Sequence, residues 1–241
     1  MWYILKPGTE CVLYEQSAAV TDVVRRRCEE LGVALHTADF SRIEPEFDSL
    51  EGQVFQYKGE AFAIPLLGAH QRKNAAVVLE TVEVLRGRGW ALAPEDVEHG
   101  LYSVSWPARF ELVGEEPCFV VDGGHNPQCA AAVADNLEIY FPDVRRVLLI
   151  GVLADKDYES MLSILAPEAE AFVCVTPDSE RALPAAELAK SLARFGKSVT
   201  VADSIREGVG AAIDEAGPEG MVCAVGSLYM AGEIRGCFGL R

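Results

Sequence analysis

Residues 118–127 read CFVVDGGHNP, and the alanine-rich segment QCAAAVADNL follows directly. Four apolar residues before an aspartate predict a buried strand with a polar carboxyl end. The two glycines let the backbone approach a ligand, and Pro127 suits the first turn of a helix. A structural turn would need only the glycines. Strand, tight turn and helix N-terminus together form an arrangement that binds anions, so this stretch predicts a nucleotide site in an α/β fold.

The chain after Pro117 repeats this alternation of strand and helix. Strands are predicted at 118–121, 147–153, 171–176, 199–202 and 221–225, and helices at 127–139, 158–165, 185–195, 204–215 and 228–237. Five such units predict a Rossmann-like, open, mostly parallel sheet with helices on both faces. Ligands bind beyond the carboxyl ends of the strands in such sheets. Polar clusters follow four of the predicted strands, at 122–126, 155–157, 176–181 and 226–227.

The chain before residue 108 has a less regular pattern. It predicts a strand at 12–14, helices at 18–31, at 70–86 and from Pro94 to Gly100, an extended piece around Leu35, and a hairpin over 53–65. The pattern is typical of the tail of a larger domain. We therefore predict two domains, 1–107 and 108–241.

Composition limits the possible partners. The formal net charge of −16 argues against a nucleic-acid or acidic-membrane surface and favours a small ligand or a protein. Seven cysteines without a Cys-x-x-Cys pair suggest neither a zinc site nor a disulfide framework, which favours a reducing compartment. The N-terminal apolar run is short for a signal peptide, and no apolar stretch approaches the roughly 20 residues of a membrane span. We predict a cytoplasmic protein.

Several short segments occur in a particular order along the chain. They read GAHQRKN at 68–74, WPARFE at 106–111, DGGHNP at 122–127, DKD at 155–157, PDSERAL at 177–183 and GSLYMAGEIR at 226–235. This order resembles the folylpolyglutamate synthase/dihydrofolate synthase family of the Mur ligase superfamily, over nearly the whole chain. The resemblance implies that residues 1–107 are a remnant of the central ATP-binding domain and that 108–241 form the Rossmann-like C-terminal domain. It also implies ATP, Mg²⁺, L-glutamate and folate or dihydropteroate as ligands. In the family, ATP phosphorylates a carboxylate of the folate or pteroate substrate, and the amine of glutamate attacks the acyl phosphate.

The resemblance also assigns nucleotide-binding residues. Asn74 would bind the adenine edge, Arg109 the phosphates and Asp122 the ribose hydroxyls, while His125 would lie near the phosphates and take part in catalysis. Two replacements depart from the family pattern, because Ala108 stands where glycine is usual and Gly124 where alanine is frequent. Without the motif, a surface ion pair to a nearby glutamate would be the preferred interpretation of Arg109. Asn126, next in the motif, has helix capping as an equally good interpretation.

The loops after the later strands supply candidates for the chemical step and for the amino acid. Lys156 is a catalytic candidate that would neutralise the acyl phosphate or bind a glutamate carboxylate. A solvated lysine between two aspartates is an equally good interpretation. Arg181 and Ser227 are candidates for binding the amino-acid substrate because of their position at the same predicted sheet edge.

The sequence contains no Gly-x-x-x-x-Gly-Lys-Ser/Thr phosphate loop. The family carries this loop and its magnesium ligands upstream of the matching segment, so we expect the parent protein to be a ligase and this chain alone to be inactive. No metal ligand is predicted within it. One alternative is a non-catalytic nucleotide-binding or interaction module, and another is a different Mur-superfamily amide ligase. A surface exposed by truncation would favour self-association.

Overall fold

The computed structural model describes residues 4–240, which divide into two compact units with the boundary between Ser105 and Trp106. We call them the N-terminal and C-terminal units. Three hydrophobic core clusters of the described residues each draw their members from one unit. Each unit is therefore described by itself.

The C-terminal unit contains a six-stranded sheet. Its strands are β6 (Glu111–Glu115), β7 (Cys118–Val121), β8 (Arg146–Ile150), β9 (Ala171–Cys174), β10 (Ser198–Val201) and β11 (Met221–Val225). The strand order is β10-β9-β8-β11-β7-β6, and all neighbours are parallel except β6, which is antiparallel to β7. The predicted mostly parallel sheet is confirmed. The edge strand β6 was not predicted, because its register shifts between Leu112 and Gly114 and its sequence lacks a regular alternation.

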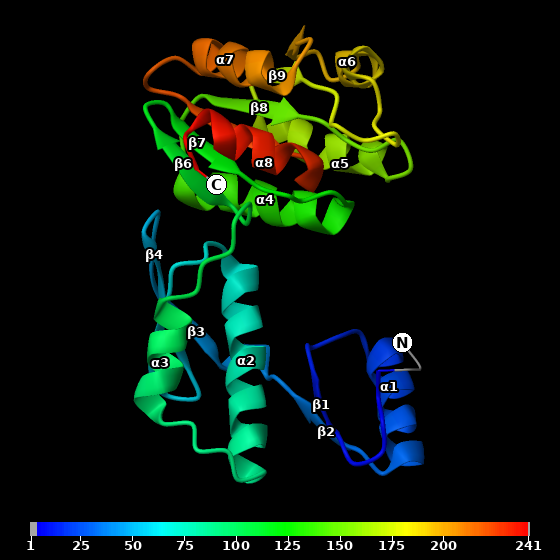
Figure 1. The fold of residues 1–241 in the computed structure, drawn as a ribbon, viewed down its shortest axis with the longest axis vertical. Coiled ribbons are helices and arrows are strands. Elements are labelled where there is room, and N and C mark those ends of the chain that lie inside the picture. Colours follow the sequence, from blue (N-terminus) through cyan, green and yellow to red (C-terminus); the bar gives the residue numbers. More distant parts are fainter. Residues whose placement is uncertain (1–3, 241) are drawn as a thin grey trace. The chain divides into compact units, whose positions relative to one another are not determined.

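Five α-helices follow the parallel strands of this sheet. They are α4 (Pro127–Tyr140), α5 (Tyr158–Leu165), α6 (Ala185–Ala193), α7 (Ile205–Ala216) and α8 (Leu228–Cys237), with a short 3-10 helix at Ala166–Glu168. Because parallel crossovers are right-handed, the strand order places α4, α5 and α6 on one face and α7 on the other. Helix α8 packs in the same cluster as α7, and Figure 1 shows α8 across the sheet. Strands β8, β9 and β11 are buried along their whole length, as expected for a sheet covered on both faces.

The N-terminal unit combines two small sheets with three α-helices. Strands β1 (Glu10–Leu13) and β2 (Ala34–Thr37) are parallel and joined by α1 (Ala18–Leu31). Strands β3 (Ile43–Ser49), β4 (Gly52–Tyr57) and β5 (Glu60–Ile64) form an antiparallel sheet, after the 3-10 helix Phe40–Arg42. The helices α2 (Ala69–Gly87) and α3 (Pro94–Tyr102) complete the unit (Figure 1).

Several details of the sequence prediction were wrong, among them the strand predicted at 171–176, which ends at Cys174, and the helix predicted at 185–195, which ends at Ala193. Strand β3 was not predicted, because Pro45 interrupts it and five of its seven residues are exposed, so no buried face marks the sequence. The helix predicted to end at Gly100 continues to Tyr102, because Leu101 is buried and holds its last turn. Strand β8 ends at Ile150 rather than Leu153, and the apolar residues beyond it belong to a buried loop.

Candidate active site

Asp122, directly after β7, holds two stretches of backbone together. Its Oδ2 accepts a hydrogen bond from the Phe110 amide at 2.9 Å, and its Oδ1 accepts one from the Gly124 amide at 2.7 Å. The side chain is buried, and this burial raises the pKa of Asp122 against the opposing effect of the two amides and the nearby Arg109 and His125. Asp122 thus fastens the segment before β6 to the loop after β7.

The glycines of this loop allow close packing of the backbone. A Cβ on Gly123 would lie 2.1 Å from Cδ2 of Leu228, and one on Gly124 would lie 2.8 Å from Oδ1 of Asp122. The Gly226 amide donates to the Gly124 carbonyl at 3.0 Å, which joins the loop after β11 to the loop after β7. The alanine frequent at position 124 in the family would therefore need a local shift in this chain.

The turn that carries Arg109 is strained on both sides of it. Ala108 has φ +56° and Phe110 has φ +47°, a backbone region that costs a non-glycine residue about 1–2 kcal/mol. Position 108 thus has the conformation that suits the family's usual glycine, and the alanine adopts it with strain. The Ala108 carbonyl accepts from the Gly123 amide at 2.9 Å, and the Ala108 amide donates to Oε2 of Glu111 at 2.8 Å.

Arg109 is partly buried and has no ion-pair partner within residues 4–240. The nearby Glu111 pairs instead with Arg235, whose Nε lies 3.1 Å from Oε2 of Glu111. The surface ion pair that the sequence left open for Arg109 is therefore not formed. A guanidinium held without a carboxylate partner is available to an anionic group.

His125 and Asn126 lie between the loop after β7 and the first turn of α4. Nδ1 of His125 lies 3.0 Å from the Gly123 carbonyl oxygen, which orients the ring. Asn126 accepts from the Cys129 amide through Oδ1 at 2.8 Å and is the N-cap of α4. The capping interpretation of Asn126 is confirmed, and its side chain organises the helix start beside His125.

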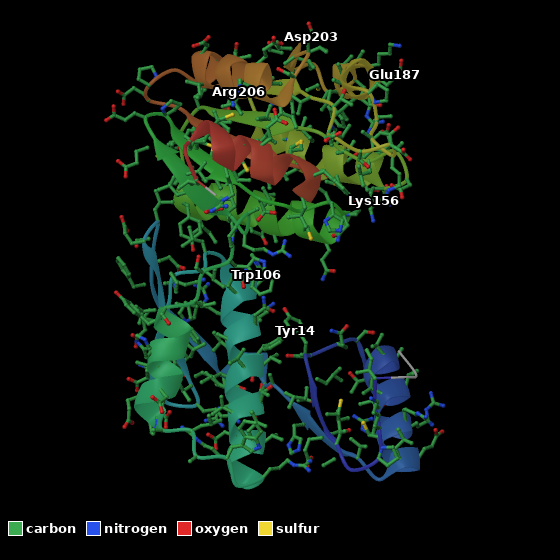
Figure 2. All side chains as sticks on the ribbon, viewed as in Figure 1. Tyr14, Trp106, Lys156, Glu187, Asp203 and Arg206 are labelled. Carbon is green, nitrogen blue, oxygen red and sulfur yellow. The ribbon has the colours of Figure 1, made fainter. Side chains whose placement is uncertain are left out.

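Lys156 follows β8 and is not paired with either neighbouring aspartate. Oδ2 of Asp155 lies 2.9 Å from Nη1 of Arg181, and Oδ1 of Asp157 caps α5 by accepting from the Ser160 amide at 3.2 Å. Figure 2 shows Lys156 at the edge of the C-terminal unit where the loops after the strands gather. Its ammonium has no ion-pair partner in the part of the chain that the structure describes.

The two candidates for binding the amino acid have different surroundings. Ser227 is buried and caps α8, because its Oγ accepts from the Tyr229 amide at 3.2 Å. Arg181 is half exposed, and a hydrogen bond with Tyr229 together with the ion pair to Asp155 raises its pKa above the usual value. Arg181 therefore presents a charged group to solvent, whereas Ser227 organises a helix N-terminus.

Asn74 lies in the N-terminal unit, in the second turn of α2. Its Nδ2 donates to Oε1 of Gln71 at 3.0 Å, and its side chain is otherwise exposed. The remaining predicted residues all belong to the C-terminal unit, at the carboxyl edge of its sheet: Arg109, Asp122, His125, Lys156, Arg181 and Ser227. Helix α8, after β11, lies on one face of the sheet, whereas α4 and α5, after the neighbouring strands β7 and β8, lie on the other. Open α/β sheets bind ligands beyond the strand ends at such a change of face.

Comparison with known proteins agrees with this geometry. Residues 108–228 match the family model described as the Mur ligase, glutamate ligase domain. The chain belongs to the Mur ligase family. Among curated Mur ligase relatives, folylpolyglutamate synthase of Lacticaseibacillus casei is 31% identical over 76% of this chain and 43% of its own length. Dihydrofolate synthase/folylpolyglutamate synthase of Mycobacterium tuberculosis is 30% identical over 97% of this chain and 53% of its own length.

A solved Mur ligase structure gives the same result. Mycobacterium tuberculosis folylpolyglutamate synthase complexed with ADP superposes with a TM-score of 0.86 at 27% identity, over 96% of this chain and 55% of that one. The chain thus spans about half the length of the Mycobacterium tuberculosis relatives it matches. The predicted resemblance is confirmed.

Sequence reasoning missed two contributors to this candidate site. Glu111 accepts from the Ala108 amide and binds Arg235, and Tyr229 contributes to the raised pKa of Arg181. Glu111 and Tyr229 lie inside the motifs at 106–111 and 226–235. No spacing rule relates Glu111 to Arg235, or Tyr229 to Arg181, because these residues are far apart along the chain. Among the helices of residues 4–240, none is long and apolar enough to cross a membrane.

Proposed function

We propose that this chain supplies the glutamate-ligase part of an ATP-dependent enzyme that joins L-glutamate to folate or dihydropteroate. The observation that carries the proposal is the loop after β7, where Asp122, Gly123 and Gly124 bind three stretches of backbone together beside the unpaired Arg109. The similarity to named folylpolyglutamate and dihydrofolate synthases supports the same reading.

The proposed reaction forms an amide between the amine of L-glutamate and a substrate carboxylate activated as an acyl phosphate. Arg109 offers positively charged N–H donors for phosphate oxygens, and His125 lies next to the N-terminus of α4, where anions bind. Asp122 keeps its backbone hydrogen bonds and uses remaining lone pairs for ribose hydroxyls. Lys156 stabilises developing negative charge.

Magnesium is assigned no ligand in this chain. Within residues 4–240, no group of three or more His, Cys, Asp or Glu side chains is arranged to hold a metal ion. The sequence also contains no Gly-x-x-x-x-Gly-Lys-Ser/Thr phosphate loop. We therefore expect the 241-residue chain to bind nucleotide but to form no product unless a phosphate-loop segment is added.

The second candidate is a non-catalytic nucleotide-binding module, which the lack of this motif favours. The two candidates differ in what a chimaera does. If the part of the Mycobacterium tuberculosis synthase outside the matched 55% is fused before this chain, a ligase part yields glutamylated product by mass spectrometry, and a module does not.

Calorimetric titration of ADP into the 241-residue chain tests the nucleotide site. Arg109→Met is the preferred variant, because Arg109 has no ion pair in the described chain and its replacement therefore breaks none. Asp122→Ala is a poor variant, because it removes two backbone hydrogen bonds. We expect Arg109→Met to weaken ADP binding about tenfold, consistent with one charged hydrogen-bonding group.

The matched control is Arg194→Met, which removes an exposed arginine that pairs with Glu159 on α5. This variant should bind ADP as the wild type does. Equal ADP affinity in wild type and Arg109→Met would contradict the proposed nucleotide site.

A further inference from the structure

An ion pair joins helix α8 to the edge strand β6 inside the C-terminal unit. Nε of Arg235, in the last turn of α8, lies 3.3 Å from Oε1 and 3.1 Å from Oε2 of Glu111, the first residue of β6. The Arg235 and Glu111 side chains are only 15% and 23% exposed. The same carboxylate accepts from the Ala108 amide at 2.8 Å through Oε2. Contacts therefore run from α8 through Glu111 to the turn before β6.

This turn has a conformation that depends on its surroundings. Ala108 and Phe110 both have positive φ, and such a backbone persists in non-glycine residues only where neighbouring contacts fix it. Both residues are 2% exposed, whereas Arg109 between them is partly exposed. The turn therefore buries its two flanks and leaves the Arg109 side chain between them in contact with solvent.

Two carboxylates fasten the two sides of the turn. On the side after Arg109, Asp122 accepts from the Phe110 amide at 2.9 Å. On the side before Arg109, Glu111 accepts from the Ala108 amide. Each strained residue thus has its backbone amide bound to a side-chain carboxylate, and the Glu111 carboxylate is in turn held by a cation from α8.

The ion pair also determines which cation the Glu111 carboxylate binds. Glu111 is two residues from Arg109, so a local ion pair between them would occupy the Arg109 guanidinium. Glu111 binds Arg235 instead, and Arg109 has no ion-pair partner within residues 4–240. An arginine bound to a neighbouring carboxylate would have to exchange that partner for a phosphate. The contact with Arg235 removes this competition.

We propose that Glu111 and Arg235 are positioning residues for the nucleotide, because they hold the turn and keep the Arg109 guanidinium available to phosphate oxygens. The inference rests on the proposed function, which assigns phosphates to Arg109. It makes α8 a part of nucleotide binding through contacts that do not involve the ligand. A turn that is fixed in advance lowers the ordering entropy lost when the nucleotide binds.

The test is a double-mutant cycle, measured by calorimetric titration of ADP into the 241-residue chain. We expect Glu111→Met and Arg235→Met each to weaken ADP binding about threefold. When Arg109→Met is already present, neither change should weaken ADP binding further, because both act through the Arg109 guanidinium. Glu111→Gln keeps an oxygen that can accept from the Ala108 amide, so it should restore part of the affinity lost in Glu111→Met.

The direction of the Glu111→Met effect separates positioning from net charge. Removal of a carboxylate near an anionic ligand strengthens binding if charge alone matters, whereas loss of positioning weakens it. Arg145→Met is the control, because it removes an ion pair to Glu215 that also joins segments distant along the chain. It should bind ADP as the wild type does. Urea unfolding of every variant verifies that it is folded under the titration conditions, and Arg235→Met and Glu111→Gln complete the test if Glu111→Met is unfolded.

Three outcomes would overturn the inference. Unchanged or tighter ADP binding in Glu111→Met, with weaker binding in Arg109→Met, would overturn it and leave the nucleotide site intact. Equal losses with and without Arg109 would show that the ion pair supports the fold and does not act through the guanidinium. No ADP binding by the wild type, or no effect of Arg109→Met, would overturn the inference together with the proposed nucleotide site.

Discussion

Asp122 shows how one side chain can serve the fold and the proposed site together. Its two oxygens satisfy the amides of Phe110 and Gly124, which would otherwise be buried without acceptors. A carboxylate is suited to this task because it accepts on both oxygens, whereas an amide accepts on one only. The residue that the motif assigns to the ribose is therefore also required for the shape of the loop.

We predict that Asp122→Asn destabilises the protein by about 1–3 kcal/mol at neutral pH, because one backbone amide loses its acceptor. Burial raises the pKa of Asp122, so the folded state holds this proton more tightly than the unfolded chain. The stabilising contribution is complete below the ordinary value of 3.8 and is lost as pH rises through the raised folded-state pKa. The stability advantage of wild type over Asp122→Asn should therefore shrink as pH rises.

Urea unfolding of both proteins at several pH values from 4 to about 8 measures this difference, and the other titrating groups cancel in it. The control is Asp203→Asn, an exposed aspartate before α7, labelled in Figure 2, whose replacement should matter little at any pH. An advantage that grows with pH would contradict the assigned direction of the pKa shift.

We also predict opposite effects for two glycine-to-alanine changes. Gly226 has φ +113°, and a Cβ there would lie 2.4 Å from the carbonyl oxygen of Gly151, so Gly226→Ala should cost more than about 2 kcal/mol. Gly210, in the exposed interior of α7, has nothing within 4 Å of its Cβ position. Gly210→Ala should stabilise the fold by about 0.5–1 kcal/mol through helix propensity. Chemical denaturation measures both, and a tolerated Gly226→Ala would mean that the loop after β11 can shift.

At the scale of elements, β8 begins with a charged residue inside the core. The Arg146 guanidinium donates to the Phe141 carbonyl at 3.2 and 3.0 Å and pairs with Glu168 at 2.8 Å and Glu138 at 3.2 Å. Burial and the neighbouring Glu138 raise the pKa of Glu168. This arrangement ties the end of α4, the start of β8 and the 3-10 helix Ala166–Glu168 at the edge opposite the candidate site.

We predict that Arg146→Ala destabilises the protein by about 3–5 kcal/mol, because Glu168 loses its cation in a half-buried setting and the Phe141 carbonyl loses its donor. The adjacent Arg145 is the matched control, since it is exposed and pairs with Glu215. Arg145→Ala should cost less than about 1 kcal/mol. Equal losses in thermal or urea unfolding would mean that the Arg146 network contributes no more than a surface pair.

At the scale of the whole molecule, each compact unit has a hydrophobic cluster made of its own residues. The cluster that packs α7 and α8 on the sheet draws every member from residues 108–238. The N-terminal unit has two separate clusters, one around Phe55 and one around Cys28. Independent cores are what independently folding units require.

We therefore predict that residues 106–241 expressed alone fold into a cooperative unit. Dispersed amide resonances by NMR and a single sigmoidal urea transition would be the expected result. A collapsed fragment that binds the dye ANS and lacks near-UV circular dichroism would contradict the prediction. The full-length chain, studied in parallel, controls for expression and solubility.

The sequence alone determined the five parallel strands of the C-terminal unit and the helices that follow them, because each strand is a strong apolar run and a polar turn separates it from the next helix. The motif DGGHNP likewise placed a polar loop at a helix N-terminus, as the Asn126 cap confirms. Only the tertiary structure decided which loops become neighbours. The strand order places β11 between β7 and β8, so Tyr229, Arg181 and Asp155 converge although they are distant in sequence.

Tertiary structure also decided the elements with weak local signals. The edge strand β6 and the exposed β3 depend on hydrogen bonds to a neighbouring strand rather than on their own apolar pattern. The positive φ of Ala108 depends on two contacts with a distant segment. The Ala108 carbonyl accepts from the Gly123 amide, and the Asp122 side chain accepts from the Phe110 amide. Local sequence determines propensity and periodicity, whereas contacts between distant segments determine register, strain and the composition of a site.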